Sequence, residues 1–269
     1  MRAITRQVTF LIILIIAFCS FPACSQSPSS PAEPPQASDP AVDLPGAAII
    51  DQLYTLQPNT AFINEVSQEL EDCGFEVDLY QGDEVTVDLY RKLPGYGYKL
   101  IIFRAHSGLL SNEGEVVRKT SLFTNEPYSE TGHVAEQLAD RLAMARINKN
   151  YPYVFSIKDT FIAHAMQGEF NDTVIIMMGC SCLHIDDLAK AFIEKGASSY
   201  VAWHATVGLG YVDKATPYLI KKLCQEGLTI KGAVGNTMSD IGPDPQFGAR
   251  LKYYPPQSGD KTLKQLTEQ

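Results

Sequence analysis

From Ala47 onward, short apolar runs alternate with stretches in which apolar residues recur every three or four positions. The first pattern is typical of buried strands and the second of helices with one buried face. Glycines such as Gly74 close several of the helical stretches. The pattern predicts strands over 47–53, 75–80, 98–105, 154–157, 173–178 and 198–203, and helices over 60–73, 87–93, 133–146, 159–167, 185–195, 214–226 and 230–238.

Strands that alternate with helices in this way predict an α/β fold with a mostly parallel sheet covered by helices. Two of the runs, 98–105 and 173–178, are apolar enough to be central strands. Between them, residues 115–123 could form a hairpin or an extended arm. Ligands of such sheets bind at the carboxyl ends of the strands, so the residues that follow these two runs are the first candidates for a site.

The N-terminus carries an export signal. Arg2 and Arg6 precede the apolar run 8–18, which has the length of a signal peptide and is short for a transmembrane helix. Ala23 followed by Cys24 resembles a bacterial lipobox, in which the cysteine is lipidated. An ordinary cleaved signal peptide and an uncleaved anchor are the alternatives.

This signal and the composition after it predict how the chain is organised. The segment after Cys24 is rich in Ser, Pro, Ala and Gln and is expected to be an extended tether. The protein is predicted to be exported to the cell envelope, as a membrane-anchored lipoprotein or in secreted form. The predicted parts are a signal peptide over 1–24, of lipoprotein type if Cys24 is lipidated, a linker over 25–45, an α/β domain over 46–242 and a C-terminal tail over 243–269.

Charge and cysteine content narrow the possible classes of function. The formal net charge is −9 and the acidic and basic residues are interspersed, which argues against nucleic-acid binding. Six cysteines occur, two of them in or beside the signal segment. The other four, Cys73, Cys180, Cys182 and Cys224, are too few for a disulfide framework in a domain of this size. A pair of them could form a bridge, or one could be a nucleophile.

Two of the predicted strands run directly into reactive residues. The run KLIIFRA leads into His106, and TVIIMM leads into Gly179 and Cys180. If both strands are central and parallel, His106 and Cys180 emerge at one edge of the sheet, where a base could activate a thiol. Gly108 and Gly179 would let a substrate backbone approach closely.

The segments IIFRAHSG and VIIMMGC, in this order on two apolar strands, resemble the caspase-like cysteine peptidases: caspases, gingipains, legumains, separases and CHAT-domain proteins. The segment LAKAFIEKGASSYVAW resembles the helix–glycine–strand unit that follows the cysteine in gingipain and CHAT domains. The resemblance covers about residues 47–239. It implies a three-layer α/β/α sandwich around a mostly parallel sheet.

The resemblance also implies roles for individual residues. Cys180 would be the nucleophile and His106 the general base and acid, while Gly108 and the Cys180 backbone N–H would form the oxyanion hole. Ser107 departs from the family pattern, which has glycine directly after the histidine.

Other residues near the same sheet edge have less specific interpretations. His204 and Asp213 could line a substrate cleft, and an acid there could select a basic substrate side chain. The segment Cys180-Ser181-Cys182-Leu183-His184 has ligand types that suit zinc, but no second ligand pair is found, so no metal site and no cofactor are predicted. Cys180 and Cys182 could also oxidise to a disulfide.

The sequence therefore supports an exported cysteine endopeptidase that acts through a thioester acyl-enzyme. The alternative is a catalytically silent caspase-like domain that serves as a surface binding module, which the Ser107 insertion and the Cys180–Cys182 pair favour. A small metal-binding lipoprotein is a third hypothesis. The expected partners are a protein or peptide substrate and a membrane surface reached through the N-terminal lipid or anchor, and no nucleic acid.

Overall fold

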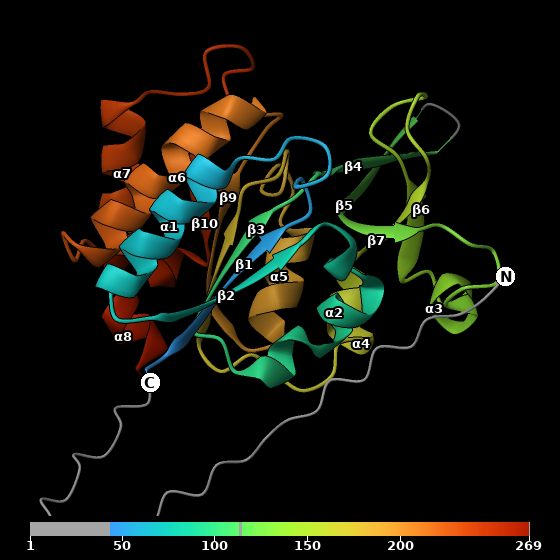
Figure 1. The fold of residues 1–269 in the computed structure, drawn as a ribbon, viewed down its shortest axis with the longest axis horizontal. Helices are drawn as coiled ribbons and strands as arrows, with labels where there is room; N and C mark the ends of the chain where they lie inside the picture. The colour runs from blue at the N-terminus through green and yellow to red at the C-terminus, as the bar shows by residue number, and fades with distance from the viewer. Residues whose placement is uncertain (1–43, 113–114, 269) are drawn as a thin grey trace, which may run out of the picture. The chain divides into compact units, whose positions relative to one another are not determined.

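The computed structural model describes residues 44–112 and 115–268. The chain is mixed α/β, with a mostly parallel sheet A and a smaller antiparallel sheet B (Figure 1). The predicted signal peptide, Cys24 and most of the predicted linker lie outside the described residues.

Sheet A has six strands within the described residues, in the order β10-β9-β8-β3-β1-β2. All neighbouring pairs are parallel except β9 and β10. The predicted mostly parallel sheet is therefore confirmed. The strands are β1 (Gly46–Asp51), β2 (Glu76–Gln81), β3 (Leu100–Arg104), β8 (Thr173–Met177), β9 (Ala197–Trp203) and β10 (Leu251–Tyr254).

The central strands are buried on both faces. Every residue of β3 and β8 is buried, which explains their unbroken apolar sequences. By contrast, β2 is an edge strand in which exposed and half-buried residues mix.

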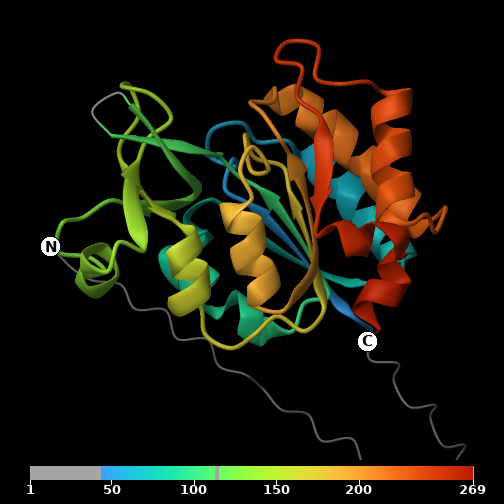
Figure 2. The same ribbon diagram turned by 180° about the vertical axis from the view of Figure 1, so that it is seen from behind.

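Helices cover both faces of sheet A (Figures 1 and 2). Alternate strand residues face opposite sides, so Ile101 and Phe103 belong to one hydrophobic cluster and Leu100 and Ile102 to the other. One face is covered by α1 (Thr60–Asp72), α6 (Leu209–Cys224), α7 (Ile230–Asp240) and α8 (Leu263–Thr267), and the other by α2 (Val87–Lys92), the 3₁₀ helix η2 (Leu93–Tyr96), α4 (Asp159–His164) and α5 (Asp187–Glu194).

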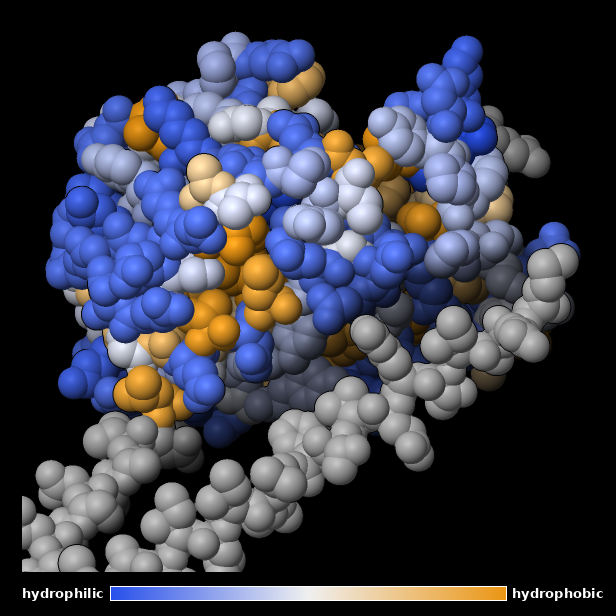
Figure 3. Space-filling model, in the orientation of Figure 1, coloured by the Kyte–Doolittle hydropathy of each residue, from blue (hydrophilic) through white to orange (hydrophobic). Residues whose placement is uncertain are grey.

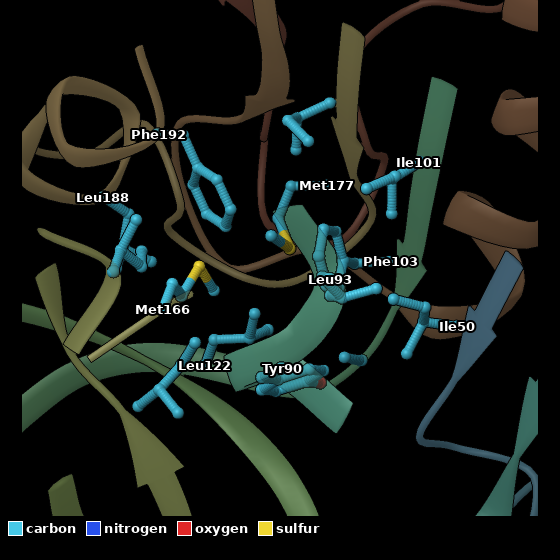
Figure 4. Packing of buried hydrophobic residues seen from close by; sticks show 14 of the residues in the cluster. Ile50, Tyr90, Leu93, Ile101, Phe103, Leu122, Met166, Met177, Leu188 and Phe192 are labelled. Atoms are coloured by element: carbon cyan, nitrogen blue, oxygen red, sulfur yellow. The ribbon is translucent and has the colours of Figure 1, made fainter. Parts of the chain in front are cut away.

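The second face has a dense aromatic and aliphatic core (Figure 4). Phe103 on β3 lies between Tyr90 of α2 and Phe192 of α5, with ring centroids 5.8 and 5.9 Å away. This packing fixes β3, the strand that leads to His106.

Sheet B lies in the chain between β3 and β8 and has the order β4-β5-β7-β6, with antiparallel pairing throughout. Residues 115–123, for which a hairpin or an extended arm was expected, lie within one strand that continues to Pro127 and pairs with the preceding strand 107–112. The elements are β4 (Ser107–Asn112), β5 (Glu115–Pro127), β6 (Leu142–Ala145) and β7 (Val154–Ile157), with α3 (Val134–Leu138) between β5 and β6.

Two sequence predictions differ from the structure. The helix predicted over 133–146 is only the five-residue α3, because Asp140 takes a positive φ of 56° and the next residues pair with β7 as β6. The predicted tail 243–269 supplies β10, η3 (Pro256–Asp260) and α8, so the fold continues well past the boundary predicted at 242. Leu251 on β10 is buried against the rest of the core.

A disulfide joins Cys73, which caps the C-terminus of α1, to Cys224, the last residue of α6. The Cα atoms are 5.4 Å apart and the two residues are separated by 151 positions. The sequence analysis left open whether two of the cysteines form a disulfide or one acts as a nucleophile, and the disulfide is present. The two helices pack side by side, so the bridge ties neighbouring elements of the same layer.

Replacing both cysteines of this bridge, Cys73→Ser with Cys224→Ser, is expected to lower the free energy of unfolding by about 2–5 kcal/mol, because the unfolded chain regains the entropy of a long open loop. Urea denaturation of the full chain measures the change. Reductant should destabilise the unsubstituted protein by a similar amount and leave the double variant unchanged. Superimposable transitions of the two oxidised proteins would contradict the prediction.

Candidate active site at the carboxyl edge of sheet A

The two predicted reactive residues lie at one edge of sheet A. β3 ends at Arg104, two residues before His106, and β8 ends at Met177, three residues before Cys180. The strands are parallel neighbours in the middle of the sheet, so the structure brings their carboxyl ends together. This edge is where ligands bind in sheets of this type.

The strand register sets His106 against Cys180. The last registered pair is Phe103 with Met177, and three further steps along both chains reach His106 and Cys180. The hydrogen bonds between β3 and β8 continue one step past this pair, because the Met178 N–H donates to the Phe103 carbonyl at 2.9 Å. The Cys180 side chain packs against the hydrophobic cluster of the α1–α6 face, and the ring of His106 lies beside Phe123 of β5, with ring centroids 5.9 Å apart.

Gly179 makes this close approach possible. A Cβ atom at position 179 would lie 2.8 Å from the carbonyl oxygen of Ala105 and would overlap the hydroxyl of Ser107. No other residue fits there without moving the end of β3. The glycine therefore lets the segments that follow β3 and β8 touch.

The Cys180 thiol is half-buried and packs against the α1–α6 core. Its sulfur lies 3.5 Å from the Val207 N–H, which donates to it, and 3.6 Å from the Val207 carbonyl. Burial raises the pKa of this thiol, the Val207 backbone opposes the rise, and the charge of Asp244 adds to it. The resting group at neutral pH is therefore a thiol rather than a thiolate.

His106 is held through its backbone. Its N–H donates to the Gln52 side chain at 2.9 Å, and its carbonyl accepts from the Phe123 N–H at 2.9 Å. Gln52 is itself fixed by Asn125, at 2.6 Å. Burial lowers the pKa of the imidazole, so the ring is neutral near pH 7. Within the described residues the ring makes no hydrogen bond, which leaves both nitrogens available to a reacting group.

Ser107 and Cys182 hold the backbone of Cys180. The Ser107 hydroxyl donates to the Cys180 carbonyl at 2.9 Å and accepts from the Cys182 thiol at 2.8 Å. Cys182 is fully buried, and burial raises its pKa to about 12. Both cysteines are free thiols in this structure, and no bond joins them. The buried Cys182 therefore supports Ser107 and, through it, the backbone of Cys180.

Backbone direction distinguishes Ser107 from Gly108 as a donor to an oxyanion. Carbonyl and N–H groups of successive strand residues point to alternate sides. The Phe103 carbonyl points to β8 and the His106 backbone points to Gln52 and β5. Ser107 lies four positions after Phe103, so its N–H points to the same side as the Phe103 backbone, which is the side of Cys180. The N–H of the next residue, Gly108, points the opposite way, towards Ser121 on β5. A Cβ at Gly108 would meet nothing within 4 Å, so the backbone there is open.

The other predicted cleft residues lie elsewhere. His204 follows β9, and its Nδ1 accepts from the Arg250 N–H at 3.0 Å, which ties it to the start of β10. Asp213 lies on α6 and is buried, with both carboxylate oxygens bonded to Arg104 at 2.8 Å. Its charge is therefore neutralised within the core. In the described part of the chain, no group of three or more His, Cys, Asp or Glu residues is arranged to hold a metal ion.

Arg104 is the important site residue that sequence reasoning missed. Its side chain is fully buried, forms two hydrogen bonds with Asp213, and donates to Asp51 at 2.8 Å. Asn59, the N-cap of α1, adds a hydrogen bond to Asp213 at 2.8 Å. The available signal was an arginine within the otherwise apolar run KLIIFRA. A buried cation requires buried anions to balance its charge. Asp51 on β1 and Asp213 on α6 supply them, and with Asn59 at the start of α1 they connect these elements to β3 just before His106.

Two hollows adjoin this edge along sheet B. One, of about 430 Å³, is lined by residues of β4, among them Ser107 and Gly108, and by residues of β5, β6 and the β6–β7 connection. The other, of about 170 Å³, lies between the loop after β1 and the same connection. Both are lined by Phe123, whose ring centroid is 5.9 Å from that of His106, and by Arg146. Figure 3 shows the surface notched beside sheet B, with hydrophobic residues visible in the notch.

Comparisons with known proteins assign no family: neither the protein-family models nor the curated proteins contain a match to this chain. Within residues 44–112 and 115–268, none of the helices combines the length and apolarity needed to cross a bilayer.

Removing the buried cation tests the Arg104 network. Arg104→Met is expected to lower the free energy of unfolding by about 3–5 kcal/mol, because Asp51 and Asp213 become uncompensated buried charges. Arg118→Met, on an exposed residue of β5, should change it by less than about 0.5 kcal/mol. Urea denaturation of the full chain measures both. A loss below about 1 kcal/mol for Arg104→Met would show that the network does not support the fold.

Proposed function

We propose that this protein is a cysteine endopeptidase of the caspase-like superfamily, with Cys180 as nucleophile and His106 as general base and acid. The observation that carries the proposal is the placement of these two residues just after the carboxyl ends of neighbouring parallel strands of sheet A. Helices on both faces of the sheet support a three-layer α/β/α sandwich of the caspase type.

The pKa directions favour a concerted activation of the thiol. Because the thiol and the imidazole both rest in neutral form, His106 accepts the Cys180 proton as the sulfur attacks the peptide carbonyl carbon. The carbonyl π electrons move to oxygen, and this oxyanion accepts hydrogen bonds from backbone N–H groups. The alternating direction of the backbone groups favours the N–H of Ser107 as one donor to the oxyanion, with the N–H of Cys180 as the other. Gly108 then remains open backbone over which a substrate can lie.

The acyl-enzyme then forms and breaks down with balanced proton transfers. The C–N bond breaks, protonated His106 gives its proton to the leaving amine, and a thioester to Cys180 remains. A water molecule attacks the thioester carbonyl while His106 takes a proton from that water. The C–S bond breaks, the thiol regains its proton, and the acid product leaves. None of these steps calls for a metal or an organic cofactor.

We also propose that the protein works outside the cytoplasm. The predicted signal peptide 1–24 would direct export, Cys24 would carry a lipid, and the linker would hold the domain away from the membrane surface. The Cys73–Cys224 disulfide supports this location, because disulfides persist in oxidising compartments.

A catalytically silent binding module is the second candidate. It is favoured by the absence, within the described residues, of a hydrogen bond between the imidazole of His106 and the thiol of Cys180, whose sulfur instead contacts Val207. In such a module the same edge and hollows would bind a protein without cleaving it.

Peptide cleavage distinguishes these two candidates. The full chain is incubated with a diverse peptide library, and the products are read by mass spectrometry. Cleavage is expected for the unsubstituted protein and for His164→Gln, whose histidine lies on α4. Cys180→Ala and His106→Gln should each reduce kcat/KM at least about 1000-fold. Cleavage that survives Cys180→Ala would mean that another group is the nucleophile. If neither the unsubstituted protein nor any variant cleaves a peptide, the binding module would be favoured.

The pH dependence of the reaction follows from the His106 environment. Burial disfavours the imidazolium, so the pKa of His106 lies below its ordinary value of 6.5 and the neutral base persists to lower pH. The acid limb of kcat/KM is therefore expected below pH 6.5, and alkylation of Cys180 by iodoacetamide should accelerate mainly above pH 9, the ordinary pKa of the thiol. An acid limb centred above pH 7 would contradict a neutral resting base.

A further inference from the structure

The surroundings of the Cys180 thiol depend on one short segment, the connection from β9 to α6, which is residues 204–208. Its Ala205 carbonyl accepts the N–H of Ser181 at 3.0 Å. Its Val207 supplies both polar contacts of the sulfur, the N–H at 3.5 Å and the carbonyl at 3.6 Å. Within the described residues no other hydrogen bond reaches this sulfur, so the position of Val207 determines its polar environment.

Asp244, in the loop between α7 and β10, holds this connection in place. One oxygen of its carboxylate accepts the N–H of Gly208, the residue directly after Val207, at 2.8 Å. The other oxygen accepts the N–H groups of Gln246 and Phe247 at 2.8 and 2.7 Å. A single carboxylate therefore ties the loop after α7 to the segment that contacts the sulfur.

The carboxylate of Asp244 is itself firmly fixed. The residue is only 2 % exposed, and in the described part of the chain no basic side chain forms an ion pair with it. Its backbone N–H donates to the Ala249 carbonyl at 2.9 Å, and its carbonyl accepts the Gly248 N–H at 2.8 Å. The three N–H groups on the carboxylate compensate for its burial, so the side chain has no reason to turn away.

The hydrogen bond and the charge act on the thiol in opposite directions. Burial is the main cause that raises the pKa of Cys180, the Val207 N–H lowers it, and the charge of Asp244 raises it by less than that hydrogen bond lowers it. The other titratable groups at this edge are His106 after β3, the buried thiol of Cys182, and Tyr211 on α6, whose pKa is raised by burial and by the charge of Asp244. Loss of the contact and loss of the charge therefore predict opposite shifts.

We propose that Asp244 is a positioning residue, which holds the β9–α6 connection so that the N–H of Val207 stays on the sulfur of Cys180. The effect on catalysis rests on the proposed function, whereas the effect on the thiol does not require it. The sulfur gains negative charge as its proton leaves, and a hydrogen-bond donor that is already in place stabilises this charge.

Alkylation of Cys180 tests the contact without any need for cleavage. The full chain reacts with iodoacetamide over a range of pH, and mass spectrometry follows the peptide that contains Cys180. Asp244→Asn is expected to move the midpoint of alkylation to higher pH, because the lost hydrogen bond outweighs the lost charge. The rate at about pH 8 should fall about 2- to 5-fold, as for the loss of one hydrogen bond. An effect of charge alone would move the midpoint to lower pH.

Gly208→Pro breaks the same contact and leaves the carboxylate charged. Gly208 has a φ of −71°, which suits proline, and proline has no N–H to donate to Asp244. The midpoint should rise at least as far as in Asp244→Asn. Asp260→Asn is the matched control, because it removes the same charge from an exposed residue of η3, which contacts β9 near its start through Ser258 and Ser199. It should leave the midpoint unchanged.

Cleavage of a peptide substrate tests the consequence for the reaction. In Asp244→Asn, kcat should fall about 10-fold while KM stays within about 2-fold, because the sulfur is misplaced and the surfaces beside sheet B are intact. Gly208→Pro should show the same division between kcat and KM. Asp260→Asn should change neither constant.

The two measurements keep failure of this inference distinct from failure of the proposed function. A midpoint that is unchanged or lower in either variant would overturn the role of Asp244, and so would an equal rise in Asp260→Asn. A raised midpoint in both variants without cleavage by any form would support the contact at the thiol and overturn the peptidase. Cleavage with an unchanged kcat in Asp244→Asn would overturn the role of Asp244 in the reaction and leave the peptidase intact.

Discussion

The fold depends on the neutralisation of one buried cation. Arg104 lies at the end of β3, fully removed from water, and Asp51 and Asp213 supply the compensating charge. Such a triad is costly to bury and still more costly to break, so the elements that carry its members have to stay in place together. These elements are β1, β3 and α6, with α1 added through Asn59. The chain leaves this cluster and reaches His106 two residues later, so the position of His106 is fixed by the cluster.

At the carboxyl edge of sheet A, sheet B lies beside His106 and continues directly from β3. β3 leads into β4 after only Ala105 and His106, so sheet B is attached directly to His106. Ser107 ties the start of sheet B to the backbone of Cys180. Displacement of sheet B would therefore disturb Cys180 and the hollows at the same time. This geometry makes the hollows, His106 and Cys180 one mechanical unit.

The apolar runs of β3 and β8 predicted the central parallel strands and placed His106 and Cys180 correctly at the sheet edge, because full burial leaves an unbroken apolar signature. Long-range pairing leaves no such signature. The Arg104–Asp213 contact joins residues 109 positions apart. The run 142–145 became a strand only because β7 was available to pair with it. Likewise, β10 is only four residues long and lies between Pro- and Gly-rich segments that hid it.

The bridge between Cys73 and Cys224 encloses all of sheet B, His106, Cys180 and the lining of the hollow of about 430 Å³ within one covalent ring. The ends of α1 and α6 are thus joined at Cys73–Cys224, and their beginnings through Asn59 and Asp213. If a protease cut any loop between the two cysteines, the two fragments would stay linked by the sulfur–sulfur bond. A processed, two-chain form of the protein would then run as a single species on a gel without reductant and separate only when the bridge is reduced.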